Sequence, residues 1–274
     1  MGAGELGGVL AHLLARRDLV ATLRMFDAHR QVAAGQSLDI MQAAPLERFS
    51  TSVSAIEDVY AAAGADVLVV ADQAGGGEWQ GDEGLTLLAK IVPLGGAPTI
   101  VCAGAVQREL VERGVRELRI PRNRILGSAP EALAAAVRAM VALETNRSAR
   151  DIVLTVLGVP PHHAVVPWEE ATIGGLAATR LLDEVARRRV AARVAPLWPP
   201  GPFALAAAAV RVIAAILQDR ACLASCFVAP DDSAGIRSRA AALPVLLGRN
   251  GIVSAVVPSL NVHDRVALEN AMML

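Results

Sequence analysis

Short apolar runs alternate with amphipathic segments along the first half of the chain. Val9, Leu10, Leu13 and Leu14 follow helical spacing and predict a helix over residues 5–16. Apolar runs predict strands at 19–27, 65–72, 98–104 and 124–127. Helices are expected between them, at 35–44, 83–92, 105–115 and 130–144. Because buried strands that alternate with helices form parallel sheets, this half predicts a doubly wound α/β fold.

The second half has a different pattern, which predicts an α+β arrangement. We expect a strand pair at 151–158 and 163–168, long helices at 172–194 and 203–219, and an antiparallel meander at 222–230, 241–248 and 252–258, followed by a helical tail from Asn261. Asn250-Gly251 indicates a hairpin turn, because both residues tolerate positive φ. The pattern changes near residues 130–148, so we expect one domain over 1–128 and another over 129–274.

Composition and charge exclude several classes of function. The 274 residues carry a formal net charge of -1, so no basic surplus points to nucleic acid, and the basic run at 184–194 is expected to be a solvated helix face. The longest apolar run, 203–217, is interrupted by Arg211 and is shorter than the roughly 20 residues of a membrane span. It predicts a buried helix, and no membrane is expected. The first residues also lack the pattern of a signal peptide.

The three cysteines are too few and too irregularly spaced for a disulfide framework, which favours a reducing, cytoplasmic setting. Cys222 and Cys226 lie four residues apart, a spacing that one helical turn would bring together around a metal ion. No third ligand has a matching spacing. We therefore expect buried free thiols and no metal site.

The first residues, MGAGELGG, place Gly2, Gly4 and Gly7 in the spacing G-x-G-x-x-G. Such a loop lets the backbone approach a phosphate, and the helix from Glu5 would direct its first amides at a pyrophosphate. Asp27 follows at the end of the next strand, where a carboxylate would meet a ribose 2′-hydroxyl and favour NAD over NADP. The pattern predicts a dinucleotide site of these four residues; the alternative is a glycine turn that only packs the helix on the sheet.

The stretches GAGELGGVLAHLLARRDL, LRMFDAHRQVAAGQSLDIMQA, GADVLVVAD, PRNRILG, RDIVLTVLG and LPVLLGRNG resemble the lactate/malate dehydrogenase family, in its order and nearly at its spacing. The resemblance covers nearly the full length. It implies a Rossmann-type domain that binds NAD, a substrate domain, and a homodimer or tetramer, since GQSLDIMQAA is similar to an association helix. The family begins with a strand that enters the glycine loop. Only Met1 precedes Gly2 here, so we expect that strand to be absent, through a misassigned start or a truncation.

The catalytic residues that the resemblance implies are not found at their positions. The family uses a histidine in a loop reading roughly G-G-H-G-D, but here the loop reads VLGVPPHHAVVP and the histidine position falls on Pro160, or on Pro161 after a one-residue shift. His162 and His163 lie close by and are the candidates for a shifted acid/base. The other interpretation is that they are exposed loop residues.

The remaining substrate-binding positions also differ from the family. The family's aspartate, which holds its histidine, falls on Leu133, and the arginine that binds the substrate carboxylate as a two-pronged donor falls on Ala136. Arg138 lies about 200° further around the helix than Ala136 and is expected to face solvent or the domain joint. The two arginines of its mobile loop fall on Gly76 and Asp82.

Three further differences complete this comparison. Glu78, Asp82 and Glu83 make the mobile loop acidic, and like charges would oppose its closure over an anionic oxo acid. The strand end whose sequence is T-N-P in the family reads CAGAVQ in this chain, without the side-chain amide. The position of the family's serine is occupied by Gly201. Each lost group contributes a factor of about 10² or more to the rate, so we expect orthodox malate or lactate reduction to be close to absent.

Three hypotheses follow. The first is a noncatalytic relative that keeps the fold, with or without a working NAD site, and acts as a sensor, a scaffold or a partner subunit. The second is an active NAD-dependent oxidoreductase for a neutral or cationic, non-dicarboxylate substrate, with His162 or His163 as acid/base. The third is a decaying gene product that binds nothing well.

Overall fold

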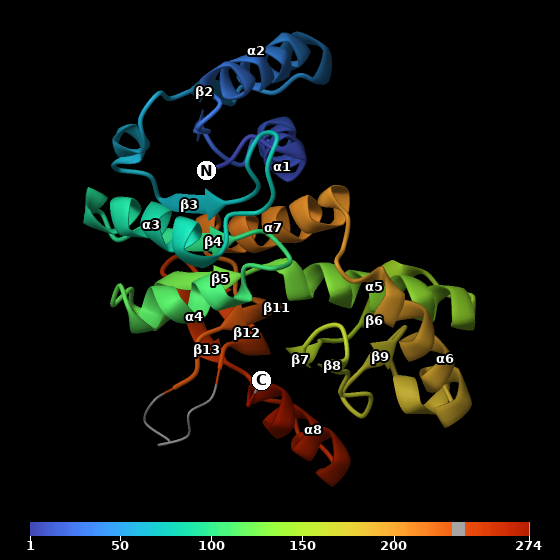
Figure 1. The fold of residues 1–274 in the computed structure, drawn as a ribbon. Coiled ribbons are helices and arrows are strands. Elements are labelled where there is room, and N and C mark those ends of the chain that lie inside the picture. Colours follow the sequence, from blue (N-terminus) through green and yellow to red (C-terminus); the bar gives the residue numbers. More distant parts are fainter. Residues whose placement is uncertain (232–238, 274) are drawn as a thin grey trace.

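The computed structural model describes residues 1–231 and 239–273 (Figure 1). The first half contains α1 (Glu5–Arg16), β1 (Thr22–Met25), α2 (Arg30–Glu47), β2 (Ser52–Ala55), β3 (Val67–Val70), α3 (Gly81–Ile91), β4 (Thr99–Cys102), α4 (Arg108–Arg116) and β5 (Ile125–Gly127). The second half contains α5 (Ala129–Thr145), β6 (Ile152–Val153), β7 (Leu157–Val159), β8 (His163–Val165), β9 (Thr172–Ile173), β10 (Leu176–Ala177), α6 (Glu184–Val194), α7 (Pro202–Leu217), β11 (Cys222–Val228), β12 (Ala241–Gly248), β13 (Gly251–Ala255) and α8 (Val262–Met272).

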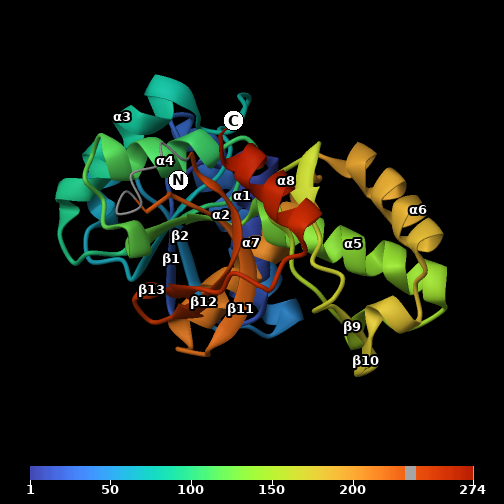
Figure 2. The same ribbon diagram turned by 90° about the horizontal axis from the view of Figure 1, so that it is seen from below.

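The main sheet joins the two halves of the chain. Its strand order is β3-β4-β5-β11-β12-β7-β8, and β13 pairs with β12. The pairs β3–β4 and β4–β5 are parallel, while Phe227 of β11 lies antiparallel to Gly127 of β5. Strands β1 and β2 form a separate parallel pair (Figure 2). The predicted α/β class is confirmed, with its parallel strands divided between two sheets.

The alanine-rich helix α7 lies at the centre of the largest apolar cluster. It packs against α1 and β12, and Ala206, Ala209 and Val210 are fully buried, which lets the neighbouring backbones approach closely. The prediction of a buried helix over this apolar run is therefore confirmed. In the described part of the chain no single helix is long and apolar enough to cross a membrane; the pair Glu184–Leu197 and Pro202–Leu217 passes the same test only together, with a bend of 103°.

The predicted meander and its turn are confirmed. β11 and β12 pair antiparallel over seven residues, and β12 continues into β13 through Asn250-Gly251. Gly251 has a φ of +90°, and a Cβ there would lie 2.1 Å from the carbonyl oxygen of Asn123. Only glycine fits this turn without displacing the backbone.

The predicted long helix at 172–194 is wrong. The segment begins with the hairpin β9–β10, which turns through Gly174 and Gly175, both at positive φ. The helix starts only at Glu184, where the Asp183 carboxylate accepts a hydrogen bond from the Ala186 amide at 2.7 Å. With α5 and α6 this hairpin forms a lobe at one side of the molecule (Figure 2). A pair of glycines followed by an N-cap aspartate is the signal that separates turn from helix here.

Two further differences concern strands. β2 was not predicted, because of its four residues only Val53 is buried and the segment carries little apolar pattern. Cys222 and Cys226 lie in strand β11, so four residues do not bring their thiols together as one helical turn would. Cys226 is buried, as expected for a free thiol, whereas Cys222 is partly exposed. Burial also raises the pKa of Cys226.

Candidate functional site

The glycine loop leads from Met1 into helix α1, and its three glycines are required by close contacts. A Cβ on Gly2 would lie 2.2 Å from the Asp72 carbonyl oxygen, one on Gly4 would lie 2.4 Å from the Asp72 carboxylate, and one on Gly7 would lie 2.3 Å from the Gly2 carbonyl oxygen. Gly2 also has a φ of +105°. The loop therefore does bring the backbone close to an anion, and that anion is the side chain of Asp72.

The side-chain carboxylate of Asp72 lies against the first turn of α1. Its Oδ1 accepts a hydrogen bond from the Gly7 amide at 2.8 Å, and its Oδ2 accepts one from the Leu6 amide at 3.1 Å. The first amides of a helix have no partner inside the helix and carry the positive end of its dipole, so they attract anions. The position predicted for a pyrophosphate thus holds a carboxylate from the end of β3.

Asp27 lies at the glycine loop, as the spacing predicted, but it is fully buried. Its Oδ2 accepts hydrogen bonds from the Ala3 amide at 2.7 Å and the Ala74 amide at 2.9 Å, and its Oδ1 accepts one from the His29 amide at 2.8 Å. Burial by itself would raise the pKa of Asp27, but these three backbone donors and the His29 ring hold the pKa below its usual value. Asp27 therefore ties together the loop, the end of β1 and the segment after β3.

The acidic loop after β3 folds back on the sheet. The Glu78 carboxylate accepts hydrogen bonds from the amides of Ala105 at 2.7 Å and Val106 at 2.8 Å, and a Cβ on Gly104 would lie 2.1 Å from it. Burial raises the pKa of Glu78, and the nearby Asp72 charge acts in the same direction. The neighbouring Trp79 is buried in the core. Glu78 is thus the second carboxylate of this chain, after Asp72, that covers backbone amides at this edge of the sheet.

The prediction that the end of β4 lacks a side-chain amide is wrong. Gln107 is buried there, and its Nε2 donates to the carbonyl oxygens of Ala71 at 2.9 Å and Trp79 at 3.2 Å, while its Oε1 accepts from the Gly104 amide at 2.9 Å. All of these contacts are internal. The carboxamide fastens the acidic loop to the ends of β3 and β4.

The other mobile-loop residues lie at the surface. Asp82 is exposed and forms an ion pair with Arg113 at 2.8 Å, and Glu83 and Gly76 are exposed. In α5, Leu133 is buried in an apolar cluster and Ala136 is partly buried, so neither offers a polar group. Gly201 precedes α7 at the surface.

His162 and His163 lie in the β7–β8 hairpin, which packs against α8. Both side chains are exposed. His163 pairs with Val159 through the backbone, and a Cβ on Gly158 would lie 2.1 Å from the His163 carbonyl oxygen. Among residues 1–231 and 239–273, no group of three or more His, Cys, Asp or Glu side chains is arranged to hold a metal ion.

Sequence reasoning missed a charged cluster between α5, α7 and β11, in which Glu131 is buried and Arg211 is about half exposed. The Glu131 carboxylate forms ion pairs with Arg138 at 2.8 Å and Arg211 at 3.2 Å, and accepts a hydrogen bond from the Ser225 amide at 3.0 Å. Arg138 therefore turns toward Glu131, within the part of the chain expected to form the second domain. Arg211, the one charge in an apolar run, was the signal that could have indicated a buried partner.

No protein-family model matches this chain. Individual proteins and solved structures are similar to it over nearly its whole length. The malate dehydrogenase of Chlorobium phaeobacteroides is 27% identical over 291 residues, which cover 99% of this chain and 93% of that protein. The malate dehydrogenase of Thioalkalivibrio sulfidiphilus is 28% identical over 292 residues, covering 99% and 94%.

Solved structures share the fold. The malate dehydrogenase of Aeropyrum pernix superimposes with a TM-score of 0.88 at 18% identity, over 99% of this chain and 94% of that one. The lactate dehydrogenase of Cryptosporidium parvum, solved with lactic acid and NAD, superimposes with a TM-score of 0.85 at 18% identity, over 99% and 93%. This chain is therefore similar over its full length to malate dehydrogenases in sequence, and it shares the fold of malate and lactate dehydrogenases.

Proposed function

We propose that this protein is a noncatalytic relative of the malate and lactate dehydrogenases, a scaffold or partner subunit that keeps their fold without their reaction. The observation that carries the proposal is the position of Asp72, whose carboxylate accepts from the Leu6 and Gly7 amides. A dinucleotide would have to displace this carboxylate before its pyrophosphate reached the helix. The negative charge would then remain close to the phosphates and oppose binding.

The residues present do not fit NAD in the arrangement described. Asp27, the candidate for the ribose hydroxyls, is fully buried, and both of its oxygens are engaged by backbone amides. With Asp72 in the pyrophosphate position, Gly2, Gly4 and Gly7 serve the approach of the chain's own carboxylate. We therefore expect NAD to bind weakly.

The substrate side supports the same proposal. Reduction of a 2-oxo acid requires a proton donor and a cation for the carboxylate. By the resemblance, the histidine position falls on proline in the β7–β8 hairpin, the aspartate that holds the histidine falls on Leu133, and the arginine that binds the carboxylate falls on Ala136. Neither Leu133 nor Ala136 can bind an anion or transfer a proton.

The test is an NADH titration by calorimetry, combined with turnover assays on malate, lactate and their oxo acids. We expect no saturable turnover and no micromolar binding. Micromolar binding together with steady-state reduction of any of these acids would refute the proposal. Micromolar NADH binding without turnover would support the noncatalytic role but contradict the expectation that NAD binds weakly.

The alternative is an oxidoreductase for a neutral or cationic substrate that uses His162 or His163. The observation in its favour is that both imidazoles are exposed and lie in one hairpin. It predicts NAD-dependent turnover of uncharged or cationic alcohols that is lost in His162→Ala or His163→Ala. A screen that finds no such turnover would leave the noncatalytic proposal standing.

Self-association as a homodimer or tetramer is part of the proposal. Leu38 and Leu46 on α2 are 60% and 85% exposed, and this helix contains the stretch that resembles the association helix of the family. Large apolar side chains that share one helix and meet solvent favour a protein partner.

A further inference from the structure

The loop between β3 and α3 places two carboxylates on one antiparallel bridge. Asp72 and Glu78 pair directly across this bridge, and the Gln73 amide donates to the Gly77 carbonyl oxygen at 2.9 Å inside it. Residues opposite one another in an antiparallel pair project their side chains from the same face. The turn at the end of the bridge, residues 75–77, consists of three exposed glycines. Two acidic side chains thus share one face of a short loop whose tip is glycine.

The two carboxylates cover the backbone amides of different segments. Asp72 lies against the first turn of α1. The Glu78 Oε1 accepts from the Ala105 amide at 2.7 Å and its Oε2 accepts from the Val106 amide at 2.8 Å, so both oxygens of Glu78 are engaged. The Val106 side chain is 49% exposed, so water can reach this segment once Glu78 leaves it.

No cation balances these two charges. Within residues 1–231 and 239–273, neither Asp72 nor Glu78 forms an ion pair, and the charged residue that opens α4, Arg108, donates instead to the Ala240 carbonyl oxygen at 3.2 Å. On the β4 side lies the buried Cys102 thiol, whose pKa is raised to about 12 by burial and, to a lesser extent, by the Glu78 charge. The groups that face Glu78 are thus a carboxylate, a neutral thiol and backbone amides.

These surroundings favour the protonated form of Glu78 in its present position. Burial raises the pKa of Glu78, the Asp72 charge raises it further, and the two amide donors lower it without cancelling the rise. An acid whose pKa is higher in one conformation binds its proton more tightly in that conformation. Protonation therefore stabilises the contact with Ala105 and Val106, and ionisation stabilises a solvated position of the side chain.

We propose that Glu78 forms a pH-dependent contact: it covers the amides of Ala105 and Val106 while it carries a proton, and it leaves them for solvent as the pH rises and the carboxyl ionises. The backbone of the turn permits this movement. Where a Cβ would stand on Gly75 or Gly77, nothing lies within 4 Å. Glycine also adopts backbone conformations that other residues do not, so this turn can change shape at little cost.

The base of the loop stays fixed during the change. The Gln107 carboxamide, which does not titrate, donates to the carbonyl oxygens of Ala71 and Trp79, one on each side of the bridge. The movement is therefore confined to residues 75–78, and Asp72 keeps its place on α1.

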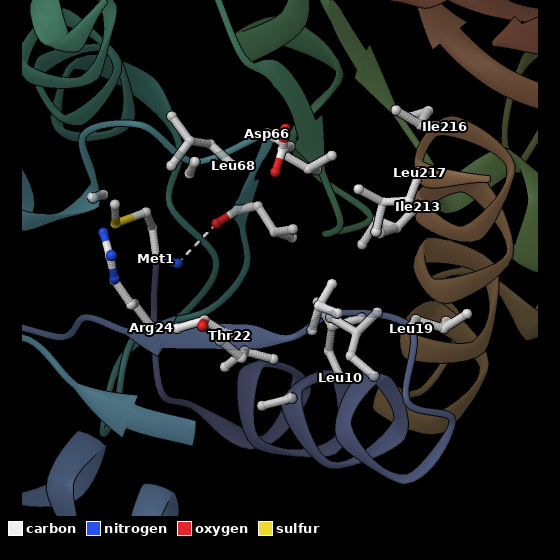
Figure 3. A pocket seen from close by; sticks show the side chains of 18 of the residues that line it. Met1, Leu10, Leu19, Thr22, Arg24, Asp66, Leu68, Ile213, Ile216 and Leu217 are labelled. Carbon is white, nitrogen blue, oxygen red and sulfur yellow. Dashed lines mark hydrogen bonds between the residues drawn. The ribbon is translucent and has the colours of Figure 1, made fainter. Parts of the chain in front are cut away.

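The released carboxylate enters solvent and not an internal space. A cavity of about 850 Å³ begins at Met1 and extends between β1 and β3, but neither Asp72 nor Glu78 lines it (Figure 3). Because the tip of the loop is exposed, ionised Glu78 regains its hydration when it leaves the two amides.

The experiment follows the parent chain by NMR between about pH 4 and 8, using the carboxyl signal of Glu78 and amide hydrogen exchange at Ala105 and Val106. Ala103, whose amide bonds to the Val70 carbonyl oxygen, is the internal control. After correction for the intrinsic exchange rate, we expect protection at Ala105 and Val106 to fall at least about threefold as Glu78 ionises. Protection at Ala103 should change much less.

Three variants identify the groups responsible. Asp72→Asn removes the like charge and should lower the pKa of Glu78, whereas Asp82→Asn, in an exposed ion pair, should leave that pKa unchanged. Glu78→Ala removes the acceptor, so protection at Ala105 and Val106 should be low at every pH.

Protection at these two amides that stays constant, or that rises, while the Glu78 signal titrates would overturn the proposal. A fall of the same size in Glu78→Ala would overturn it as well, because another group would then cause the change. Equal Glu78 pKa values in Asp72→Asn and the parent chain would also count against it. None of these measurements involves NAD or a substrate, so their outcome is independent of the proposed noncatalytic role.

Discussion

The carboxylate of Asp72 accepts a hydrogen bond from the amide of Gly7 at 2.8 Å, across 65 residues of sequence. The glycine of a phosphate-type loop thus serves a side chain from a neighbouring strand. A helix N-terminus does not distinguish one anion from another by kind, only by charge and fit. The same loop can therefore bind a nucleotide or be closed by its own protein, and the residue at the end of β3 decides between the two.

Removal of the Asp72 carboxylate is predicted to open this anion site. Asp72→Gly should increase the affinity for inorganic pyrophosphate and NADH at least tenfold, since a unit charge about 4 Å from a phosphate costs up to about 4 kcal/mol near a surface. The variant should also unfold more easily, by about 1–3 kcal/mol, because two helix amides lose their acceptor. Calorimetric titration and urea unfolding measure the two effects.

The matched control for this prediction is Asp82→Asn, which removes a charge from an exposed residue in the first turn of α3. It should leave pyrophosphate affinity within twofold of the parent. Equal affinities for Asp72→Gly and the parent chain would show that Asp72 does not close the site.

Substitution of Asp27 is predicted to reduce stability in a pH-dependent way. The pKa of Asp27 lies below that of the unfolded chain, about 3.9, so the native state binds fewer protons. Its stabilisation is complete above the unfolded pKa and is lost as the pH falls through the lower folded pKa. Asp27→Asn should therefore lower the free energy of unfolding by about 2–4 kcal/mol at pH 7, with a smaller difference at the acid end. Asp39→Asn, on the exposed side of α2, serves as control; a constant difference at all pH values would contradict the prediction.

The sequence predicts those parts of the fold and site that depend on local pattern. Helix α1 begins and ends at the predicted residues, and Asp27 reaches the glycine loop, because strand–loop–helix spacing is a short-range property. The hairpin β9–β10 was missed because its two-residue strands carry almost no periodic signal. Its glycine pair was the informative feature.

The function of the loop depends on contacts that sequence spacing does not encode. In the sequence Asp72 ends a predicted strand and Glu78 belongs to an acidic loop, yet each accepts hydrogen bonds from amides of a distant segment. The pairing of Glu131 with Arg138 and Arg211 likewise joins three elements that only the tertiary fold brings together. A pattern of glycines predicts an anion site, but it does not identify the anion.

The Glu131 cluster is predicted to stabilise the joint between α5, α7 and β11. Glu131→Ala leaves the Ser225 amide without its acceptor and removes the partner of Arg138 and Arg211, and should cost about 1–3 kcal/mol. Glu131→Gln keeps an acceptor and should cost less. Urea unfolding measures both, with Glu184→Gln in an exposed ion pair as control, expected to change stability by less than about 1 kcal/mol. Equal effects at Glu131 and Glu184 would exclude a special role for the Glu131 cluster.

Self-association is predicted to depend on α2. Leu38 and Leu46 present apolar side chains to solvent from one helix, and burying them between two copies would remove that surface from water. The double variant Leu38→Glu with Leu46→Glu should shift the protein from dimer or tetramer to monomer at micromolar concentration, as measured by light scattering after size exclusion. Leu143→Glu changes a leucine of similar exposure, 70%, on α5 and should leave the assembly intact. Dissociation by Leu143→Glu but not by the α2 variant would assign the contact to the α5 surface, and a monomeric parent chain would remove self-association altogether.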